Sequence, residues 1–414
     1  MRITFAHLAD CHIGSWKDVR MRDLASEAFD SAVELCLSKN VDFVLVAGDL
    51  FHTSLPAIDS IKRAVEALRR LRDRHIPVYL IPGSHDFSPS GKTMLDVLEK
   101  AGLCVNVARG SAEEEKLVLS FTTDHKTGVK LAGVLGRRGM LEKGYFQDLD
   151  RPSLEQEPGF KIFMLHTAIE ELKPKELRGV EAPALSLLPK GFSYYAAGHV
   201  HYVLEQRLQA GGVLVYPGPL FPDNFHEIEE LGHGGFFLVR ADTDTGDVSL
   251  ERVPVVVRNA ASLALDCEGL SPEAVSQRLI ERIRSQEFAS TIVALRLSGR
   301  LSSGKASDVD FKAVFAELYA RGAHFVMRNT AALESPEFEA IAVKQSTVEE
   351  IEEAAIAEHA GQFAVPGWSP ERHRQAAEAL MRALSSEQPE GERKQDYEKR
   401  LLSEIRGLFG LDEG

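Results

Sequence analysis

Five short blocks that contain histidine and carboxylate side chains recur along the first half of the chain. In order, they are Asp10 with His12, Gly48-Asp49, Gly83-Ser84-His85-Asp86, His166, and Gly198-His199-Val200-His201. Their imidazole nitrogens and carboxylate oxygens supply nearly all the ligands that two adjacent divalent metal ions need. Such a pair of ions can clamp both the attacking and the leaving oxygen of an in-line phosphoryl displacement. The blocks therefore predict a metal-dependent phosphoesterase.

The ligand chemistry narrows the class of metal. The set mixes nitrogen with oxygen donors and has no thiolate, which suits manganese, iron or zinc better than calcium or a closed structural zinc site. Which of these metals is bound stays open. We expect the first metal ion to be bound by Asp10, His12 and His201, and the second by His166 and His199. Asp49 should bridge the two ions.

A short apolar run precedes each block and predicts a buried strand. The runs are residues 3–8, 43–47, 78–81, 162–165 and 194–197. Loops at the carboxyl ends of such strands can bring side chains together from distant parts of the chain. Taken singly, a His-x-His pair or a Gly-Asp step is often an ordinary surface, core or turn feature. Five such blocks in order, all at strand ends, favour a site.

The same blocks carry a resemblance to a known family. The segments HLADCHIG, VAGDLFHTSLP, IPGSHD and AAGHVH, the last followed by YPG, resemble the calcineurin-like metallophosphoesterases. Within that family the chain is most similar to the double-strand-break-repair nucleases of archaeal type, which are related to the bacterial SbcD subunit. The resemblance is strong over residues 1–255 and looser beyond them.

That resemblance implies two bound divalent ions, expected to be Mn²⁺, and hydrolysis of DNA phosphodiesters by a homodimer. Cleavage would be exonucleolytic on double strands and endonucleolytic on single strands. It further implies that His85 protonates the leaving oxygen and that Asp86 holds the His85 imidazole in the right tautomer. His52 would position nucleic acid or donate a proton, although it could also merely cap the following turn.

One position departs from the family pattern. Where the family has an asparagine whose carbonyl is a ligand of the second metal, this chain has Ser84. A serine hydroxyl is shorter and a weaker neutral donor, so a water can take that coordination position instead. Ser84 therefore leaves open the alternative that the protein is a weakened or non-catalytic DNA-repair scaffold. A metallophosphodiesterase for small nucleotide substrates is the other alternative.

We expect a four-layer α-β-β-α sandwich, two mixed sheets flanked by helices, as a nuclease domain over residues 1–255. Strands at 263–265, 292–297 and 325–327 alternate with helices opened by Ser271-Pro272 and by Asp310, which predicts a small α+β module over residues 256–345. In the family such a module is a capping domain that helps to select the DNA substrate.

Residues 346–414 predict a helical region. Ser346 or Thr347 can form a capping box with a glutamate three residues later, and Ser369-Pro370-Glu371 can open a second helix. Helices this short and this separated need a partner for their apolar faces. In the family this region binds the coiled coil of an SMC-like ABC ATPase. The alternative is that the helices pack on their own domain.

The net charge of −14 over 414 residues argues at first sight against a nucleic-acid partner. Half of this excess lies in residues 346–414, which hold 15 acidic and eight basic side chains. A local basic cluster, Lys126, Lys130, Arg137 and Arg138, is a candidate for DNA contact.

No apolar run approaches the length of a membrane span, and no signal-like leader precedes the first strand, so we expect a cytoplasmic, nucleoid-associated protein. The four cysteines are scattered and predict free thiols.

Overall fold

The computed structural model describes residues 1–88, 93–137, 143–174, 177 and 179–336, and scattered positions between 368 and 406. The chain divides into two units, Met1–Arg300 with Ala306–Leu333, and Leu301–Lys305 with Glu334–Gly414. The first unit contains every block described above. The helices predicted after residue 346 lie almost wholly outside the described residues, so their partner-binding role stays a prediction.

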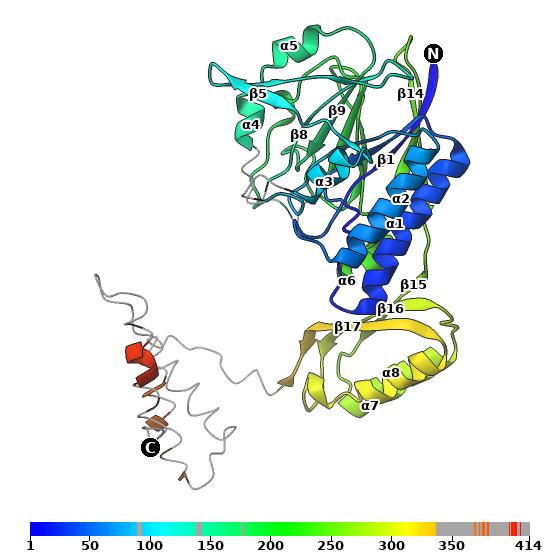
Figure 1. Cartoon of the computed structure of the whole chain (residues 1–414). Helices are drawn as coiled ribbons and strands as arrows, with labels where there is room; N and C mark the ends of the chain where they lie inside the picture. The colour runs from blue at the N-terminus through cyan, green and yellow to red at the C-terminus, as the bar shows by residue number, and fades with distance from the viewer. Residues whose placement is uncertain are drawn as a thin grey trace. The chain divides into compact units, whose positions relative to one another are not determined.

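Two six-stranded sheets form the centre of the first unit (Figure 1). The first has the order β14-β13-β1-β2-β3-β4, with the bounds Val248–Val255, Gly234–Asp242, Arg2–Leu8, Phe43–Ala47, Val78–Ile81 and Val105–Asn106. The second has the order β11-β12-β10-β9-β8-β7, with the bounds Val203–Arg207, Val213–Pro217, Tyr194–Gly198, Lys161–His166, Lys130–Val134 and Thr122–Thr123.

Both sheets are mixed, and their central strands run parallel. In the first sheet β1, β2 and β3 are parallel neighbours, while β13 joins β1 antiparallel. In the second sheet β8, β9, β10 and β12 are parallel, and β11 closes the edge antiparallel. The carboxyl ends of β1, β2 and β3 therefore share one edge of the first sheet, and those of β9 and β10 share one edge of the second.

Alternation of side chains along the strands places one apolar layer between the sheets and one on each outer face. The inner layer joins the two sheets through residues such as Phe5, Phe43, Ile162 and Tyr194. Helices α1 (Val19–Lys39), α2 (Ile58–Asp73) and α3 (Met94–Lys100) contribute to the outer layer of the first sheet. Helices α4 (Lys143–Gln147) and α5 (Arg151–Gln156) contribute to that of the second. The result is the expected four-layer α/β sandwich.

Three further parts complete the first unit. A hairpin pairs β5 (Gly110–Glu113) with β6 (Lys116–Leu119), and α6 (Phe225–Leu231) lies between β12 and β13 in the chain. Its described 3₁₀ turns include η3 (Leu185–Leu187) and η4 (Ala306–Asp308). Among the described residues, no helix has the length and apolar character needed to cross a membrane. All four cysteines are buried free thiols, as predicted.

The expected small α+β module has its own three-stranded sheet, in the order β15-β16-β17. The strands are Asn259–Asp266, Thr291–Arg300 and Ala323–Glu334, and they alternate with α7 (Pro272–Arg284) and α8 (Phe311–Ala320). Ser271 and Asp310 cap the two helices, as predicted, by accepting hydrogen bonds from the third residue that follows each of them. The two domain boundaries, expected after residue 255 and after residue 345, remain predictions.

Candidate metal centre

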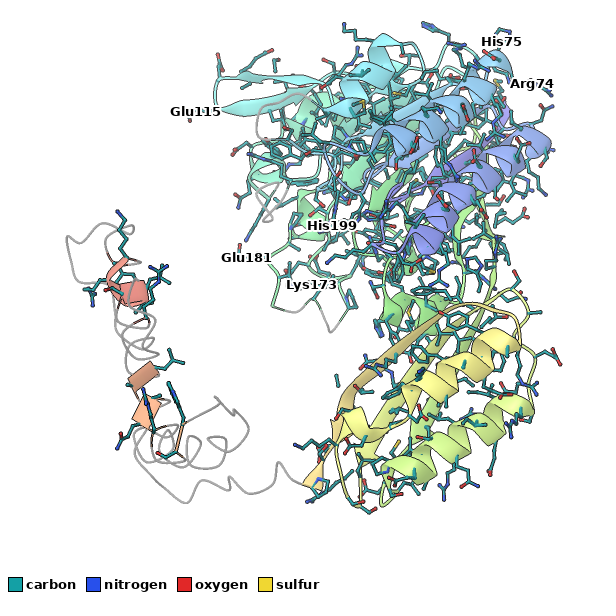
Figure 2. All side chains as sticks on the ribbon, turned by 60° about the horizontal axis from the view of Figure 1, so that its bottom comes forward. Arg74, His75, Glu115, Lys173, Glu181 and His199 are labelled. Carbon is teal, nitrogen blue, oxygen red and sulfur yellow. The ribbon has the colours of Figure 1, made fainter. Side chains whose placement is uncertain are left out.

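All five blocks meet where the carboxyl ends of the parallel strands of the two sheets face each other. Asp10 and His12 follow β1, Asp49 follows β2, His166 ends β9, and His199 and His201 follow β10. In Figure 2 the labelled His199 lies well apart from Arg74 and His75, which stand before the amino end of β3. Parallel strands thus gather side chains from almost two hundred residues of chain at one place.

Two groups of these side chains have ligand atoms that all lie within 4.8 Å of one another, and a third, His12 with His52 and His85, adjoins them. The first group is Asp10, His12 and His201, and the second is Asp49, His166 and His199. In the first, the Nε2 atoms of His12 and His201 are 2.9 Å apart. In the second, His166 Nε2 lies 3.1 Å from Asp49 Oδ2.

The Asp49 carboxylate lies between the two groups. Its Oδ2 atom is 3.1 Å from His166 Nε2 in the second group and 3.8 Å from His12 Nε2 in the first. Asp10 Oδ1 lies 3.9 Å from His166 Nε2, so the two groups are immediate neighbours. Two clustered sets of inward-facing nitrogen and oxygen donors around a shared carboxylate fit a pair of divalent ions of the manganese, iron or zinc class.

The far nitrogens of two histidines are held by hydrogen bonds that turn Nε2 towards the centre. His166 Nδ1 donates to the carbonyl of Ala47, at 2.7 Å, and His201 Nδ1 donates to Glu227 Oε1, at 2.8 Å. A proton fixed on Nδ1 leaves Nε2 as the lone-pair nitrogen, which is the form a metal requires.

The backbone at the site is unusual in two ways. Asp10, His12, Asp49, His199 and His201 all have positive φ, between 42° and 96°, a region that non-glycine residues seldom adopt. The glycines before them allow close packing: a Cβ on Gly48 would lie 2.1 Å from His166 Nδ1, and one on Gly83 would lie 2.2 Å from Asp49 Oδ1. Both features are typical of a site whose geometry is imposed by the fold.

At the centre, burial and neighbouring charges shift the pKa values of the ligand side chains in opposite directions. Burial raises the pKa of Asp10 to about 6, against the imidazoles of His201 and His166. Burial alone would lower the pKa of His166, but the carboxylate of Asp49 outweighs it and raises that pKa to about 10. The same pairing holds the pKa of Asp49 well below its ordinary value despite burial. In the absence of an ion, the Asp49 carboxylate therefore favours a proton on His166 Nε2, the nitrogen that a metal would take.

Comparison with known proteins agrees with this geometry. Residues 3–203 match the family model for calcineurin-like phosphoesterases. This segment is a calcineurin-like metallophosphoesterase domain. The matched residues include every member of both groups.

Archaeal DNA double-strand break repair proteins named Mre11 are similar over more of the chain. The Archaeoglobus fulgidus protein is 32% identical over 239 residues, which cover 55% of this chain and 52% of that protein. The Thermoplasma acidophilum protein is 28% identical over 305 residues, 72% of this chain and 77% of that protein. The match thus spans about half the length of the first relative and three quarters of the second.

Among solved structures, a Thermus thermophilus protein matches with a TM-score of 0.38 at 17% identity, over 61% of this chain and 99% of that one. A dimetal phosphatase from Danio rerio gives 0.36 at 13% identity, with the same coverage of each chain. The fold assignment rests on the sheet topology and the family model, not on these likenesses.

His85 lies beside the two groups of this phosphoesterase domain. Its ring centroid is 4.8 Å from that of His12 and 5.0 Å from that of His52. Its backbone N–H donates to Asp49 Oδ1, at 2.7 Å, and its Nδ1 donates to the carbonyl of His52, also at 2.7 Å. The imidazole is therefore oriented by a backbone carbonyl.

Asp86 does not have the predicted position. Instead of holding the His85 imidazole, its carboxylate accepts hydrogen bonds from the backbone N–H groups of Leu50, Phe51 and Gly83, each at 3.1 Å. Burial, followed by the nearby charge of Asp49, raises the pKa of Asp86 to about 7 although these N–H groups oppose the shift. Asp86 thus ties the loop after β2 to the loop after β3. The prediction that it holds the His85 imidazole is wrong, and any support it gives to His85 passes through the backbone.

Ser84 lies at the shared carboxylate. The residue is buried, and its Oγ donates to Asp49 Oδ2 at 3.4 Å. The structure therefore places this hydroxyl beside the second group, and its role as a metal ligand stays a prediction.

Two carboxylates that the sequence reasoning missed complete the surroundings. Glu227 is bonded to His201, and Asp223 Oδ2 lies 3.7 Å from His52 Nδ1. Both belong to the segment around α6, more than 20 residues after His201. Their only local signal is the N-cap pattern Asn224-x-x-Glu227, which by itself indicates a helix start and not a site.

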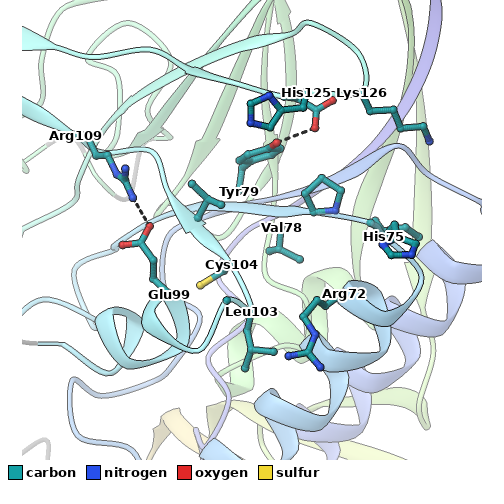
Figure 3. A pocket seen from close by; sticks show the side chains of 15 residues that line it. Arg72, His75, Val78, Tyr79, Glu99, Leu103, Cys104, Arg109, His125 and Lys126 are labelled. Atoms are coloured by element: carbon teal, nitrogen blue, oxygen red, sulfur yellow. Dashed lines mark hydrogen bonds and ion pairs between the residues drawn. The ribbon is translucent and has the colours of Figure 1, made fainter.

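Two cavities flank the domain at different places. One of about 530 Å³ opens beside His52 and is lined by Trp16, Lys17, Arg22 and Asp223 among others. The other, of about 710 Å³, lies at the amino end of β3 and holds none of the predicted site residues (Figure 3). The charged groups at its rim pair with carboxylates, as Arg109 does with Glu99 at 2.6 Å. The cavity beside His52 is the one adjacent to the metal centre.

The predicted basic cluster is mostly neutralised in its described part. Lys126 pairs with Asp42 at 2.7 Å, and Lys130 pairs with Glu157. The Arg137 guanidinium lies over the rings of Phe87 and Tyr145. Arg138 lies outside the described residues. These pairings reduce the cluster's value as a contact for DNA phosphates.

Proposed function

We propose that this protein is a two-metal nuclease that hydrolyses DNA phosphodiesters, with Mn²⁺ as its metal. The observation that carries the proposal is the Asp49 carboxylate between two sets of histidine and carboxylate ligands. The similarity to relatives named as DNA double-strand break repair proteins favours DNA over a small nucleotide as substrate.

Asp10, His12 and His201 would hold one ion, and His166 and His199 the other, with Asp49 shared and Ser84 beside the second. When bound, the two ions supply an activated water and neutralise charge on the phosphate. The residues themselves fix where the scissile phosphate can sit, because their nitrogens and oxygens converge at the edge of both sheets.

His85 is the proposed general acid. Since its Nδ1 donates to the His52 carbonyl, proton donation to the leaving oxygen falls to Nε2. His52 lines the neighbouring cavity, together with Lys17 and Arg22, and its ring also lies near those of His12 and His85. It would position the strand that flanks the scissile phosphate, with proton donation as its other possible role.

The biological setting follows as part of the same proposal. Residues 1–255 would be the nuclease domain, 256–345 a capping domain that selects DNA, and 346–414 the helices that bind an SMC-like coiled-coil ABC ATPase. The protein would work as a homodimer on broken ends at the nucleoid, in the cytoplasm, as a double-strand exonuclease and single-strand endonuclease. The names of the similar archaeal proteins support a role in break repair.

The test is Mn²⁺-dependent degradation of linear DNA by the purified chain, beside a His85→Ser variant and a measurement of bound metal per subunit. We expect two ions per subunit and degradation that the variant loses. Cleavage of a chromogenic phosphodiester without cleavage of DNA would favour a small-substrate enzyme. Capture of the ATPase by a chain without any nuclease activity at millimolar Mn²⁺ would favour a scaffold.

A further inference from the structure

We propose that Glu227 is a positioning residue for His201, and that the Glu229–Arg296 ion pair couples this position to the three-stranded sheet. The affinity of the first metal group would then depend on how that sheet is seated. The inference rests on the metal-binding role proposed for Asp10, His12 and His201. It concerns the segment 220–231, which includes α6 and links β12 to β13.

Glu227 is a buried carboxylate whose two oxygens are both engaged. Oε1 accepts the Nδ1 proton of His201, at 2.8 Å, and is also bonded by the side-chain amide of Asn224. Oε2 accepts the backbone N–H of Asp223, at 2.7 Å. A carboxylate held at both oxygens has one orientation, so it fixes the rotation of the His201 ring and raises the basicity of Nε2.

The same segment contacts the first group at other points. The N–H of Leu220 donates to the carbonyl of Asp10, at 3.2 Å, and Trp16 Nε1 donates to the carbonyl of Pro222, at 3.1 Å. Asp223 faces His52. A displacement of this segment would therefore be felt by the first group and by His52, whereas the second group has no such link to it among the described contacts.

Glu229 joins α6 to the three-stranded sheet. Its carboxylate accepts from Arg296 Nε at 2.9 and 3.0 Å and also pairs with Nη2, and Arg296 belongs to β16. The Arg296 guanidinium stacks over Phe225 of α6, 5.2 Å from the ring centroid. The Glu229 side chain is only 13% exposed, so this bidentate pair is better shielded than most of the surface pairs of this protein.

Spacing along α6 explains how one short helix can contact both the metal centre and the three-stranded sheet. Residues two apart on an α-helix point to opposite sides, so Glu227 can face the metal centre while Glu229 faces the sheet. Both residues lie within one turn of a seven-residue helix, so we treat the helix as one rigid piece. A shift of β16 that pulls on Glu229 must therefore move Glu227, and with it the His201 imidazole.

The experiment measures metal affinity and not cleavage. Mn²⁺ binding is titrated, and the visible spectrum of bound Co²⁺ is recorded as a report on ligand geometry. A His199→Ala background removes a ligand of the second group, so that the first group is measured separately. Into this background go Glu227→Ala, Glu227→Gln, Arg296→Met, Glu229→Gln and the charge swap Glu229→Arg with Arg296→Glu.

We expect Glu227→Ala to weaken Mn²⁺ binding by about 10- to 100-fold and Glu227→Gln, which keeps an acceptor, to recover part of that loss. Arg296→Met and Glu229→Gln should each weaken it by about three- to tenfold and change the Co²⁺ spectrum. The charge swap should restore binding. The matched control is Arg321→Met, which breaks an ion pair with Glu317 in α8, away from α6, and should leave binding unchanged.

Two results would overturn the inference, and they are distinguishable. If the unaltered chain binds two ions but Arg296→Met and Glu229→Gln behave like Arg321→Met, the coupling is wrong while the proposed metal centre stands. If the unaltered chain binds fewer than two ions, the proposed function itself fails. Thermal unfolding of each variant, followed without metal, identifies any that lose binding only because they fail to fold.

Discussion

The two groups of the metal centre use the same residue types but are supported in different ways. In the second group, His166 is fully buried and its Nδ1 is held by the backbone of β2 at Ala47. In the first group, His201 is 22% exposed and its Nδ1 is held by the side chain of Glu227 on α6. β2 is held by a neighbouring strand on each side, whereas Glu227 projects from a short helix, so we expect the first support to be the more rigid. The comparison indicates a fixed second group and an adjustable first group.

The largest effect should come from the residue that both groups share. Asp49→Asn keeps the shape of the side chain but removes the charge between the two sets of ligands. We expect binding of both ions to be lost and Mn²⁺-dependent DNA cleavage to fall by roughly 10³-fold or more, since each ion contributes several kcal/mol to the transition state. Cleavage and metal stoichiometry measure this. Retention of two tightly bound ions would contradict the shared role.

A steric change can test the fixed character of the second group. Gly48→Ala places a Cβ 2.1 Å from His166 Nδ1, while Gly128→Ala, also at positive φ, meets nothing within 4 Å. The strain of positive φ, about 1 kcal/mol, is common to both. We expect Gly48→Ala to lower the free energy of unfolding by about 2–4 kcal/mol, because the clash adds to that strain. It should also weaken the second metal site.

Urea unfolding without metal, together with Mn²⁺ titration, gives both quantities. Equal destabilisation by the two alanines would mean that the loop after β2 adapts, and that the second group is no more rigid than the first.

The sequence indicated which side chains meet at the centre because each block is local. A strand, a glycine and a candidate metal-binding side chain follow one another within a few residues, as in Gly48-Asp49, and the order of the blocks was enough to assign the family. The fold followed for the same reason, since apolar strand runs and helix caps such as Ser271 are also local signals.

The contacts between distant segments could not be predicted. Glu227 meets His201 only because the fold brings α6 to the loop that follows β10, and no spacing in the chain encodes that. Asp86 shows the converse: adjacency to His85 in sequence suggested a contact, but the turn after β3 directs the Asp86 carboxylate to three backbone N–H groups instead. Likewise, Lys126 seemed available for DNA until the structure paired it with Asp42.

A buried histidine outside the metal centre, His7, shows what burial does to a histidine pKa when no carboxylate opposes it. His7 is fully buried and hydrogen-bonded to the hydroxyl of Tyr194, at 2.9 Å, and burial lowers its pKa from 6.5 to about 3. His166 is equally buried, but Asp49 shifts its pKa in the opposite direction. Between pH 6.5 and 3 the unfolded chain binds a proton at His7 that the folded chain does not, so stability from this residue is lost as the pH falls.

We expect that loss to amount to about 2 kcal/mol between pH 7 and pH 5, since each pKa unit is worth about 1.4 kcal/mol. His7→Gln should therefore unfold with a weaker pH dependence over this range, measured by urea titration in the presence of a chelator. His125→Gln, at an exposed histidine, is the control. An unchanged pH dependence in His7→Gln would mean that His7 takes up a proton in the folded state.

The smallest expected effect concerns the one departure from the family pattern. Ser84 Oγ lies 3.4 Å from the shared Asp49 oxygen, and a longer amide at this position would place a stronger neutral oxygen donor beside the second group. We expect Ser84→Asn to tighten Mn²⁺ binding at that group by about tenfold, the lower end of the range that outer-shell partners contribute. Ser84→Ala separates the added ligand from loss of the hydroxyl. If both variants bind Mn²⁺ as the unaltered chain does, the side chain at position 84 contributes nothing to metal affinity. Ser84 would then not weaken the enzyme.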